Sequence, residues 1–330
     1  MKFLSFCDII IKEVNMEIEY KTIDEQIEEI KKKNIIFKDE ENAKDILLKE
    51  NYYNVITAYK DIFINIKMSK NNGTETCDSE TYFEEIYEVY NFDRELRNLM
   101  FKYISIIENN IKSCISNVFS EKYGTINYLK PENFNITSKN KYLFEELMSR
   151  IKSNVSRNIN NYDDIKQCKK ENNTIPLWML TTLMTFGNMT NFYNLLKIED
   201  KKEIAMLFQI NYRDMNIFLK ILNIIRNISA HGTVLFNIKI DIKYPLRGDS
   251  YYHEKLKIPI ENNTYVNGIN DLLAVIIILK RFLQGKRYIK FTHELEEIIN
   301  DVKEELDSKS FENFMEEMGI PLNYTELKEL

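Results

Sequence analysis

The chain has 330 residues, of which 44% are hydrophobic and 29% charged, as is ordinary for a globular protein. Its 8 glycines and 5 prolines are too few for the many tight turns of an all-β sandwich or barrel. A formal net charge of −6 excludes a uniformly basic nucleic-acid-binding protein, but it is compatible with a local basic groove.

The start of the chain lacks the cleavage site of a signal peptide, and Met16 is an alternative start because the helical pattern sharpens after it. The longest apolar run, Leu272–Leu279, is far shorter than the ~20 residues of a membrane span. We therefore expect a buried helix there and no membrane partner. Cysteines occur far apart and without a CxxC pair, at Cys7, Cys77, Cys114 and Cys168. This spacing favours reduced thiols in a cytoplasmic protein over a zinc or disulfide framework.

The first strong helical pattern begins at Thr22, which can complete a capping box with Glu25. A second helix is expected near Asp39. The apolar stretch 52–68 fits a helix or a packed turn, and residues 71–74 read as a turn.

A long helix is predicted from Asn91 to about Lys122. Its apolar residues recur at helical spacing, at Leu96, Leu99, Met100, Tyr103, Ile107, Ile111, Ile115 and Phe119. Further helices are expected from Ser138 and Pro176, with a break at Gly187.

The segment 211–231 is apolar over most of its helical circumference, which predicts a central helix ending at the C-cap residue Gly232. Weak alternation over 236–246 indicates a short hairpin strand, and two or three helices finish the chain. The fold class is thus mainly all-α. The expected parts are a tail (1–19), an N-terminal helical part (20–90), a helical core (91–238) and a mostly helical C-terminal region that can include a short β-hairpin (239–330).

Only three histidines occur, so each can be assessed for chemistry. His253 lies in a polar loop and is expected to be solvated. His293 is followed by ELEE and lacks the second histidine of the zinc-protease motif HExxH. His231 differs from both because it ends the apolar central helix.

Three polar side chains meet at that helix end. Asn227 and His231 are four residues apart and share a face, and the long side chain of Arg226 can reach back to the same place. An imidazole that moves protons near neutral pH and an arginine that stabilises phosphate charge suit phosphoryl transfer. Because no acidic cluster with metal-binding spacing accompanies them, we expect no metal and no cofactor. The alternative is that Arg226 and His231 only cap helix carbonyls.

The segment Arg226–His231, RNISAH, resembles the Arg-x4–6-His motif of the HEPN ribonuclease superfamily. Other segments over roughly residues 20–238 resemble, in order, the AbiD/AbiF-like abortive-infection family within it. They are QIEEIKKKNIIFKDEENAKDILLKENYY, FDRELRNLMFKYISIIENNIKS, SEKYGTINYLKPENF, PLWMLTTLMTFGNMTNFYNLLK and LNIIRNISAHGTVLFN.

The resemblance implies a HEPN-type helical bundle and a role in anti-phage defence. It also implies a metal-independent endoribonuclease in which the 2′-hydroxyl attacks the adjacent phosphate, leaving a 2′,3′-cyclic phosphate and a 5′-hydroxyl. Arg226 and His231 would be catalytic, and Asn227 would orient or contact phosphate. Because such sites are composite, a homodimer is implied.

The chain also departs from the family pattern. The segment 52–59, YYNVITAY, lacks the usual arginine and glycine, Lys112 replaces an arginine four residues after Glu108, and Gly232 replaces a frequent second histidine. Glu108, with Asp93 and Arg94, could support the site from the long helix. The alternative role of these three residues is a salt bridge between helices.

Several basic residues could track an RNA backbone. They are Lys139, Lys141, Arg150, Arg157, Lys169, Lys170, Lys286 and Arg287. A solvated helix face is the alternative for each basic run. The resemblance further implies RNA rather than DNA as partner, including a small noncoding RNA that restrains or guides the nuclease as in a toxin–antitoxin pair. An RNA-binding or sensor protein with a non-catalytic site is the alternative function.

Overall fold

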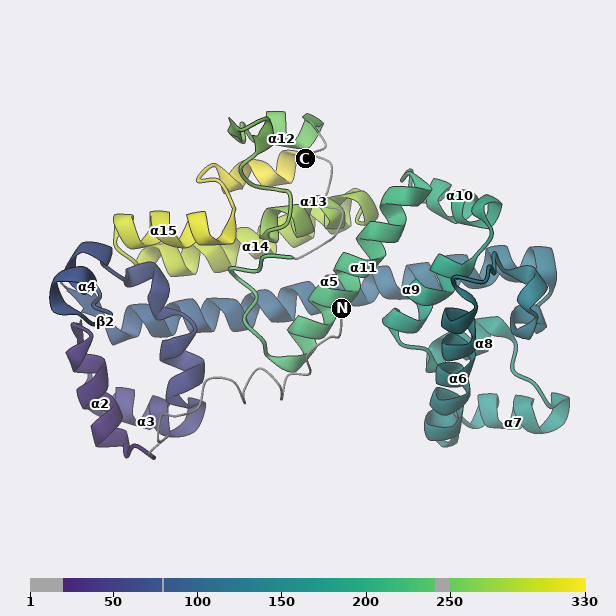
Figure 1. Ribbon diagram of the computed structural model, residues 1–330, viewed down its shortest axis with the longest axis horizontal. Coiled ribbons are helices and arrows are strands. Elements are labelled where there is room, and N and C mark those ends of the chain that lie inside the picture. The colour runs from purple at the N-terminus through teal and green to yellow at the C-terminus, as the bar shows by residue number, and fades with distance from the viewer. Residues whose placement is uncertain (1–19, 79, 241–249) are drawn as a thin grey trace. The chain divides into compact units, whose positions relative to one another are not determined.

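The computed structural model describes residues 20–78, 80–240 and 250–330 (Figure 1). The chain forms two compact units, one up to Tyr90 and one from Asn91 to Leu330. Both are built mainly from helices, as the all-α prediction required. The predicted tail, 1–19, lies outside the described residues.

The N-terminal unit is a set of short helices joined by a small two-stranded parallel sheet. Thr22 and Glu25 form the expected capping box, and Asp39 caps the second helix. The apolar stretch after residue 52 forms a π-helical turn, a 3₁₀ turn and a short α-helix instead of one element. In chain order the elements are α2 (Ile23–Lys32), β1 (Ile35–Ile36), α3 (Glu40–Glu50), the π-helical turn Tyr53–Thr57, the 3₁₀ turn Lys60–Phe63, α4 (Ile66–Asn72) and β2 (Thr81–Tyr82).

The long helix α5 (Phe83–Tyr123) starts eight residues before the predicted position. It does so because Phe83, Ile86 and Tyr90 continue the buried apolar stripe toward the N-terminus. Near its other end, Phe119 packs against Phe192, with ring centroids 5.4 Å apart.

Five shorter helices and several turns follow α5 and lead to α11. They are α6 (Lys141–Asn158), α7 (Asp163–Asn172), α8 (Leu177–Leu183), α9 (Phe186–Leu195) and α10 (Ile198–Met206), with 3₁₀ turns at Asn127–Leu129, Pro131–Asn133 and Ile159–Asn161. The expected start at Ser138 is wrong by three residues, because Asn140 first accepts a hydrogen bond from the backbone N–H of Thr137. The expected break is present, but it falls at Met184 and Thr185 and not at Gly187. Thr185 and Asn188 form a capping box that places the glycine inside α9.

Helix α11 (Tyr212–His231) is capped by Asn211 and ends at Gly232, whose φ of 74° is left-handed, as predicted. It packs against α9, α10 and α13 (Leu272–Phe282). One apolar stripe of α11 is buried. The helix is not buried all round, however, because Ile224 is 40% exposed.

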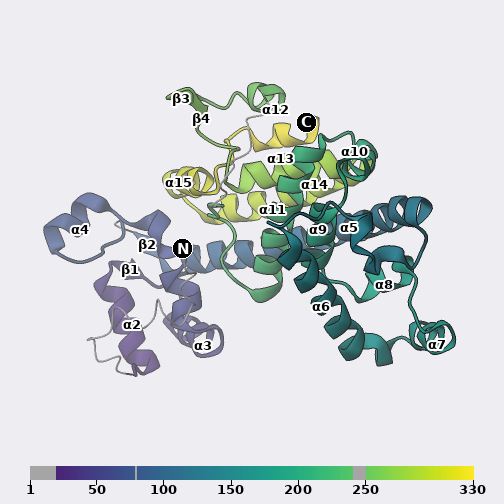
Figure 2. The same cartoon turned by 45° about the vertical axis from the view of Figure 1, so that its right-hand side comes forward.

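The C-terminal stretch forms a layer of helices along one side of α5 (Figures 1 and 2). Phe291 and Phe314 of this layer contact Tyr103 and Phe92 of α5. Residues 272–279 are all buried in α13, as expected for the apolar run. The elements are α12 (Ser250–Lys255), β3 (Ile260–Glu261), β4 (Thr264–Tyr265), α13, α14 (Lys286–Glu305), α15 (Ser308–Met318) and the 3₁₀ helix Tyr324–Glu329.

A short hairpin exists in this region, but not where alternation predicted it. The hairpin joins β3 and β4, whereas residues 236–240 form no strand and 241–249 lie outside the described residues. The backbone N–H of Phe236 donates to the Asp93 carboxylate and that of Ile240 to the carbonyl of Asn270, so neither joins a ladder. Among the described residues, each helix is too short or too polar to cross a bilayer.

Candidate functional site

Arg226 lies where α11 passes α5. Its Nε is 3.7 Å from Oε2 of Glu108, and its guanidinium carbon is 5.4 Å from the ring centroid of Phe101. The side chain of Arg226 is 31% exposed, and its Nε has no hydrogen-bond partner among the described residues. This Nε is buried, so the guanidinium is held by charge and by stacking, and its terminal nitrogens, which form no hydrogen bond among the described residues, remain for a further acceptor.

Glu108 is the centre of a three-residue ion cluster. Its Oε1 lies 2.8 Å from Nζ of Lys112, four residues later on α5, and its Oε2 faces Arg226. The Glu108 residue is only 7% exposed. Two cations, Lys112 and Arg226, thus share one buried carboxylate. The cluster therefore has one positive charge in excess, which favours the approach of a phosphate.

Glu108 is among the residues that the sequence suggests as support for the site, whereas Phe101, which stacks against Arg226, is not. Positions 101, 108 and 112 follow the helical period, so their side chains share one face of α5. This periodicity is the sequence signal that groups Phe101 with Glu108. It does not reveal that α11 lies against this face of α5.

His231 and Asn227 are both exposed on the last turns of α11. Among the described residues none forms a hydrogen bond or ion pair with the His231 side chain, so both ring nitrogens are open to solvent or a ligand. The left-handed Gly232 ends the helix directly after the histidine. This arrangement places an imidazole at the C-terminal end of a helix, beside backbone carbonyls that carry partial negative charge.

The two other residues named as possible support have different surroundings. Asp93 is fully buried, pairs with Arg97, and its Oδ1 accepts hydrogen bonds from the backbone N–H groups of Leu235 (3.0 Å) and Phe236 (2.7 Å). It therefore tethers the segment that follows His231. Arg94 is exposed and donates to Oδ1 of Asn91 at 2.8 Å, one turn earlier on α5.

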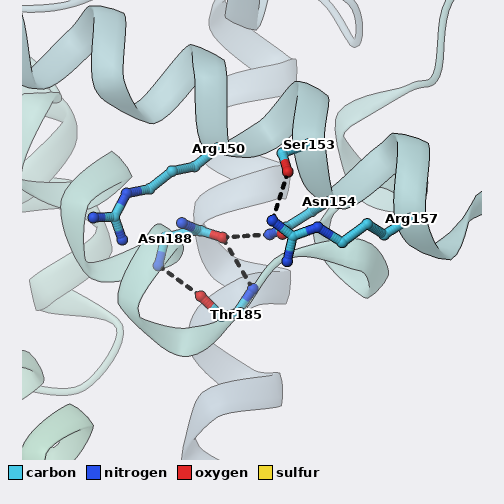
Figure 3. A pocket seen from close by; sticks show the side chains of 6 residues that line it. All are labelled: Arg150, Ser153, Asn154, Arg157, Thr185 and Asn188. Atoms are coloured by element: carbon cyan, nitrogen blue, oxygen red, sulfur yellow. Dashed lines mark hydrogen bonds between the residues drawn. The ribbon is translucent and has the colours of Figure 1, made fainter.

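Two of the predicted RNA-binding residues, Arg150 and Arg157, line a pocket of about 270 Å³ between α6 and the start of α9 (Figure 3). Arg150 also pairs with Glu146 at 2.6 Å, and Arg157 donates to Oγ of Ser153 at 2.8 Å. Figure 3 shows Asn188 between the two guanidinium groups. Two arginines around one pocket suit a phosphate.

The remaining basic candidates lie elsewhere. Lys286 and Arg287, at the start of α14, line a different pocket of about 310 Å³ together with Phe208 and Phe282. The other four are exposed on or beside the ends of α6 and α7, at Lys139, Lys141, Lys169 and Lys170. The eight residues therefore belong to two pockets and to two exposed helix termini.

The other two histidines have different environments. The expectation that His253 is solvated is wrong: it is 1% exposed, its ring stacks on Tyr265, and its Nε2 lies 3.2 Å from the carbonyl oxygen of Gly268. The hairpin and the glycine turn enclose it. His293 is exposed and lies 3.4 Å from the Glu297 carboxylate. Across the part of the chain that the structure describes, no three His, Cys, Asp or Glu residues are grouped to hold a metal ion.

Comparisons with known proteins identify one family. No curated protein and no solved structure matches the chain. The model of the Abi-like protein family matches residues 45–237, more than half of the chain, and this span contains Glu108, Arg226 and His231. The chain therefore belongs to the Abi-like protein family, a family of abortive-infection proteins.

Proposed function

We propose that this protein acts in anti-phage abortive infection as a metal-independent endoribonuclease of the HEPN type, close to the AbiD/AbiF-like group. The observation that carries the proposal is the Arg226–Asn227–His231 set at the open end of α11. There an unengaged imidazole lies five residues after an arginine whose side chain is partly exposed. Membership of the Abi-like family supports the defence role.

The chemistry requires a base, an acid and a stabiliser of negative charge. The ribose 2′-hydroxyl loses its proton to a base and attacks the adjacent phosphorus. The bond from phosphorus to the 5′-oxygen then breaks, and that oxygen takes a proton from an acid, leaving a 2′,3′-cyclic phosphate and a 5′-hydroxyl. His231 supplies proton transfer, Arg226 stabilises the charge on the phosphoryl oxygens, and Asn227 contacts the phosphate.

A homodimer completes this site. Base and acid act on opposite sides of the phosphorus, so one imidazole cannot easily serve as both in a single event. A two-fold dimer places a second His231 opposite the first. Light scattering of the active protein should give about twice the monomer mass of 39.5 kDa. Full activity at the monomer mass would contradict the composite site.

The decisive experiment compares two histidine variants on a short unstructured RNA. His231→Ala should reduce cleavage by at least about 100-fold, the usual contribution of a positioned acid or base. His293→Ala, which also removes an exposed imidazole, should leave cleavage unchanged. Both variants should keep the wild-type melting temperature, because neither side chain is buried.

Two further arms of this experiment test the mechanism. Cleavage should persist in EDTA, and it should stop when the sugar at the cut is 2′-deoxy, because the nucleophile is then absent. The alternative function is an RNA-binding sensor in which Glu108 neutralises Arg226. Tight RNA binding without cleavage, unchanged by His231→Ala, would favour that alternative. An associated small noncoding RNA would copurify with the protein as a nuclease-sensitive component.

A further inference from the structure

A pocket of about 400 Å³ lies between α5 and α8, beside the Glu108 cluster. Lys112 belongs to both, since it lines the pocket and pairs with Glu108. The pocket is therefore within one helical turn of the carboxylate that faces Arg226.

The α5 wall of this pocket is a polar stripe. Asn109, Lys112, Ser116 and Asn117 lie at helical spacing, on the side of α5 opposite the buried apolar residues. Each asparagine offers both an amide donor and a carbonyl acceptor. A stripe of this kind can match the mixed donors and acceptors on the edge of a nucleobase.

Ser116 gives an independent indication of a ligand. The residue is 1% exposed, and its hydroxyl has no hydrogen-bond partner among the described residues. A buried hydroxyl without a partner loses the hydrogen bonds that it would make to water, so its burial is unfavourable. Since Ser116 lines the pocket, a ligand inside it can supply the missing partner.

The opposite wall carries Trp178, the only tryptophan of the chain. Its side chain is 58% exposed, although the adjacent Leu177 and the nearby Leu180 of α8 are almost completely buried. The hydroxyl of Thr181 donates to the backbone carbonyl of Trp178 at 3.0 Å. A rigid helix thus presents a large indole surface to solvent, which is how proteins stack unpaired bases.

The charge of the lining separates this pocket from the arginine pocket of Figure 3. Of the described residues around Trp178, none is acidic, and the one cation, Lys112, is already paired with Glu108. The excess positive charge of the Glu108 cluster lies on Arg226, which is outside this lining, so the pocket itself offers a phosphate no cation that is free of a carboxylate. A neutral, planar heterocycle would find an aromatic face and amide groups.

We propose that the α5–α8 pocket binds one unpaired nucleobase of the RNA, stacked on Trp178 and contacted at its edge by Asn109, Asn117 and Ser116. The inference rests on the proposed function, for which it names a base-recognition subsite beside the reacting phosphate. A base held there would fix the strand relative to Arg226 and give the cleavage a preference among nucleotides.

The single tryptophan allows a direct test with the full-length His231→Ala protein, which binds without cutting. Adenosine, cytidine, guanosine and uridine monophosphates are titrated while the fluorescence of Trp178 is followed. We expect saturable quenching by at least one nucleotide and none by ribose 5-phosphate, which lacks a base. Equal quenching by ribose 5-phosphate, or none by any nucleotide, would overturn the proposal.

Variants in the same His231→Ala background then measure affinity for a labelled unstructured RNA by anisotropy. Trp178→Ala should weaken binding about 10- to 100-fold, the value of one base stack, and Trp178→Phe should restore most of the loss. Ser116→Ala should weaken binding less. The matched control is Tyr142→Ala, which removes another aromatic residue, 63% exposed and outside the pocket lining, and should change nothing.

Each outcome separates this inference from the proposed function. If the wild type cleaves RNA while Trp178→Ala binds and cleaves normally, the subsite is wrong and the nuclease assignment stands. If nucleotides quench Trp178 but the wild type cleaves nothing, the nuclease assignment fails and the base site stands. If Trp178→Ala changes only the mass seen by light scattering, the face is a protein interface and the proposal fails.

Discussion

Helix α5 carries two carboxylates with the same local arrangement and opposite surroundings. Asp93 pairs with Arg97, and Glu108 pairs with Lys112, each four residues further along the helix. Asp93 is fully buried, and one of its oxygens accepts two backbone hydrogen bonds from the segment after α11. Glu108 instead directs its second oxygen toward Arg226, at 3.7 Å, which is beyond hydrogen-bond length.

This difference distinguishes a structural anchor, at Asp93, from a candidate binding site, at Glu108. Around Asp93, buried charges and backbone N–H groups are matched within the protein, which is the arrangement that holds a loop in place. Around Glu108, the partly exposed Arg226 has an Nε without a hydrogen-bond partner among the described residues. Because that Nε is buried, a ligand would engage the terminal nitrogens of the partly exposed guanidinium, which form no hydrogen bond among the described residues.

The largest effect on stability is expected at the anchor. Asp93→Ala removes the carboxylate that pairs with the buried Arg97 and accepts from the backbone N–H groups of Leu235 and Phe236. Breaking a buried pair in this way lowers the free energy of unfolding by about 3–5 kcal/mol. Urea denaturation followed by circular dichroism measures this loss, with Glu108→Ala as the matched variant. Equal losses of unfolding free energy in Asp93→Ala and Glu108→Ala would show that Asp93 is no more important for stability than Glu108.

A smaller effect on stability, but a specific effect on activity, is expected at Glu108. Glu108→Gln keeps the shape but removes the charge that holds Arg226 and Lys112, so cleavage should fall about tenfold, equivalent to ~1.4 kcal/mol. The double variant with Arg226→Ala should be no slower than Arg226→Ala alone, because Glu108 acts through the arginine. Losses that simply add would show that Glu108 acts on the RNA independently of Arg226.

The features of the fold that the sequence predicts correctly are set by residues that are close together in the chain. The capping box of Thr22, the start of a second helix near Asp39 and the end of α11 at Gly232 are short-range signals, and all three are observed. The errors occur where a second local signal competes. Thr185 with Asn188 outweighs Gly187 at α9, and the Asp93 carboxylate engages the backbone of Phe236 that alternation assigned to a strand.

The candidate site is predictable only in part, because some of its contacts join residues that are far apart in the chain. The spacing of Arg226, Asn227 and His231 is local and can be read directly. The contact between Arg226 and Glu108 joins positions that are far apart in the chain, and periodicity alone cannot choose among the carboxylates of α5. The exposed Trp178 and the unpartnered Ser116 become informative only when α8 is seen against α5.

The smallest effect is expected at Arg94, the third residue that the sequence suggested as support. It is exposed, and its hydrogen bond to Asn91 lies within one turn of the same helix. Exposed contacts of this kind contribute little, so Arg94→Ala should change the free energy of unfolding by no more than about 0.5 kcal/mol and leave the cleavage rate unaltered. Urea denaturation and the oligonucleotide assay measure both quantities on one preparation. If cleavage is lost while stability is retained, Arg94 contacts the RNA or a second copy of the chain. Helix α5 would then carry a third functional residue, one that contributes to cleavage from an exposed position and not from a buried one.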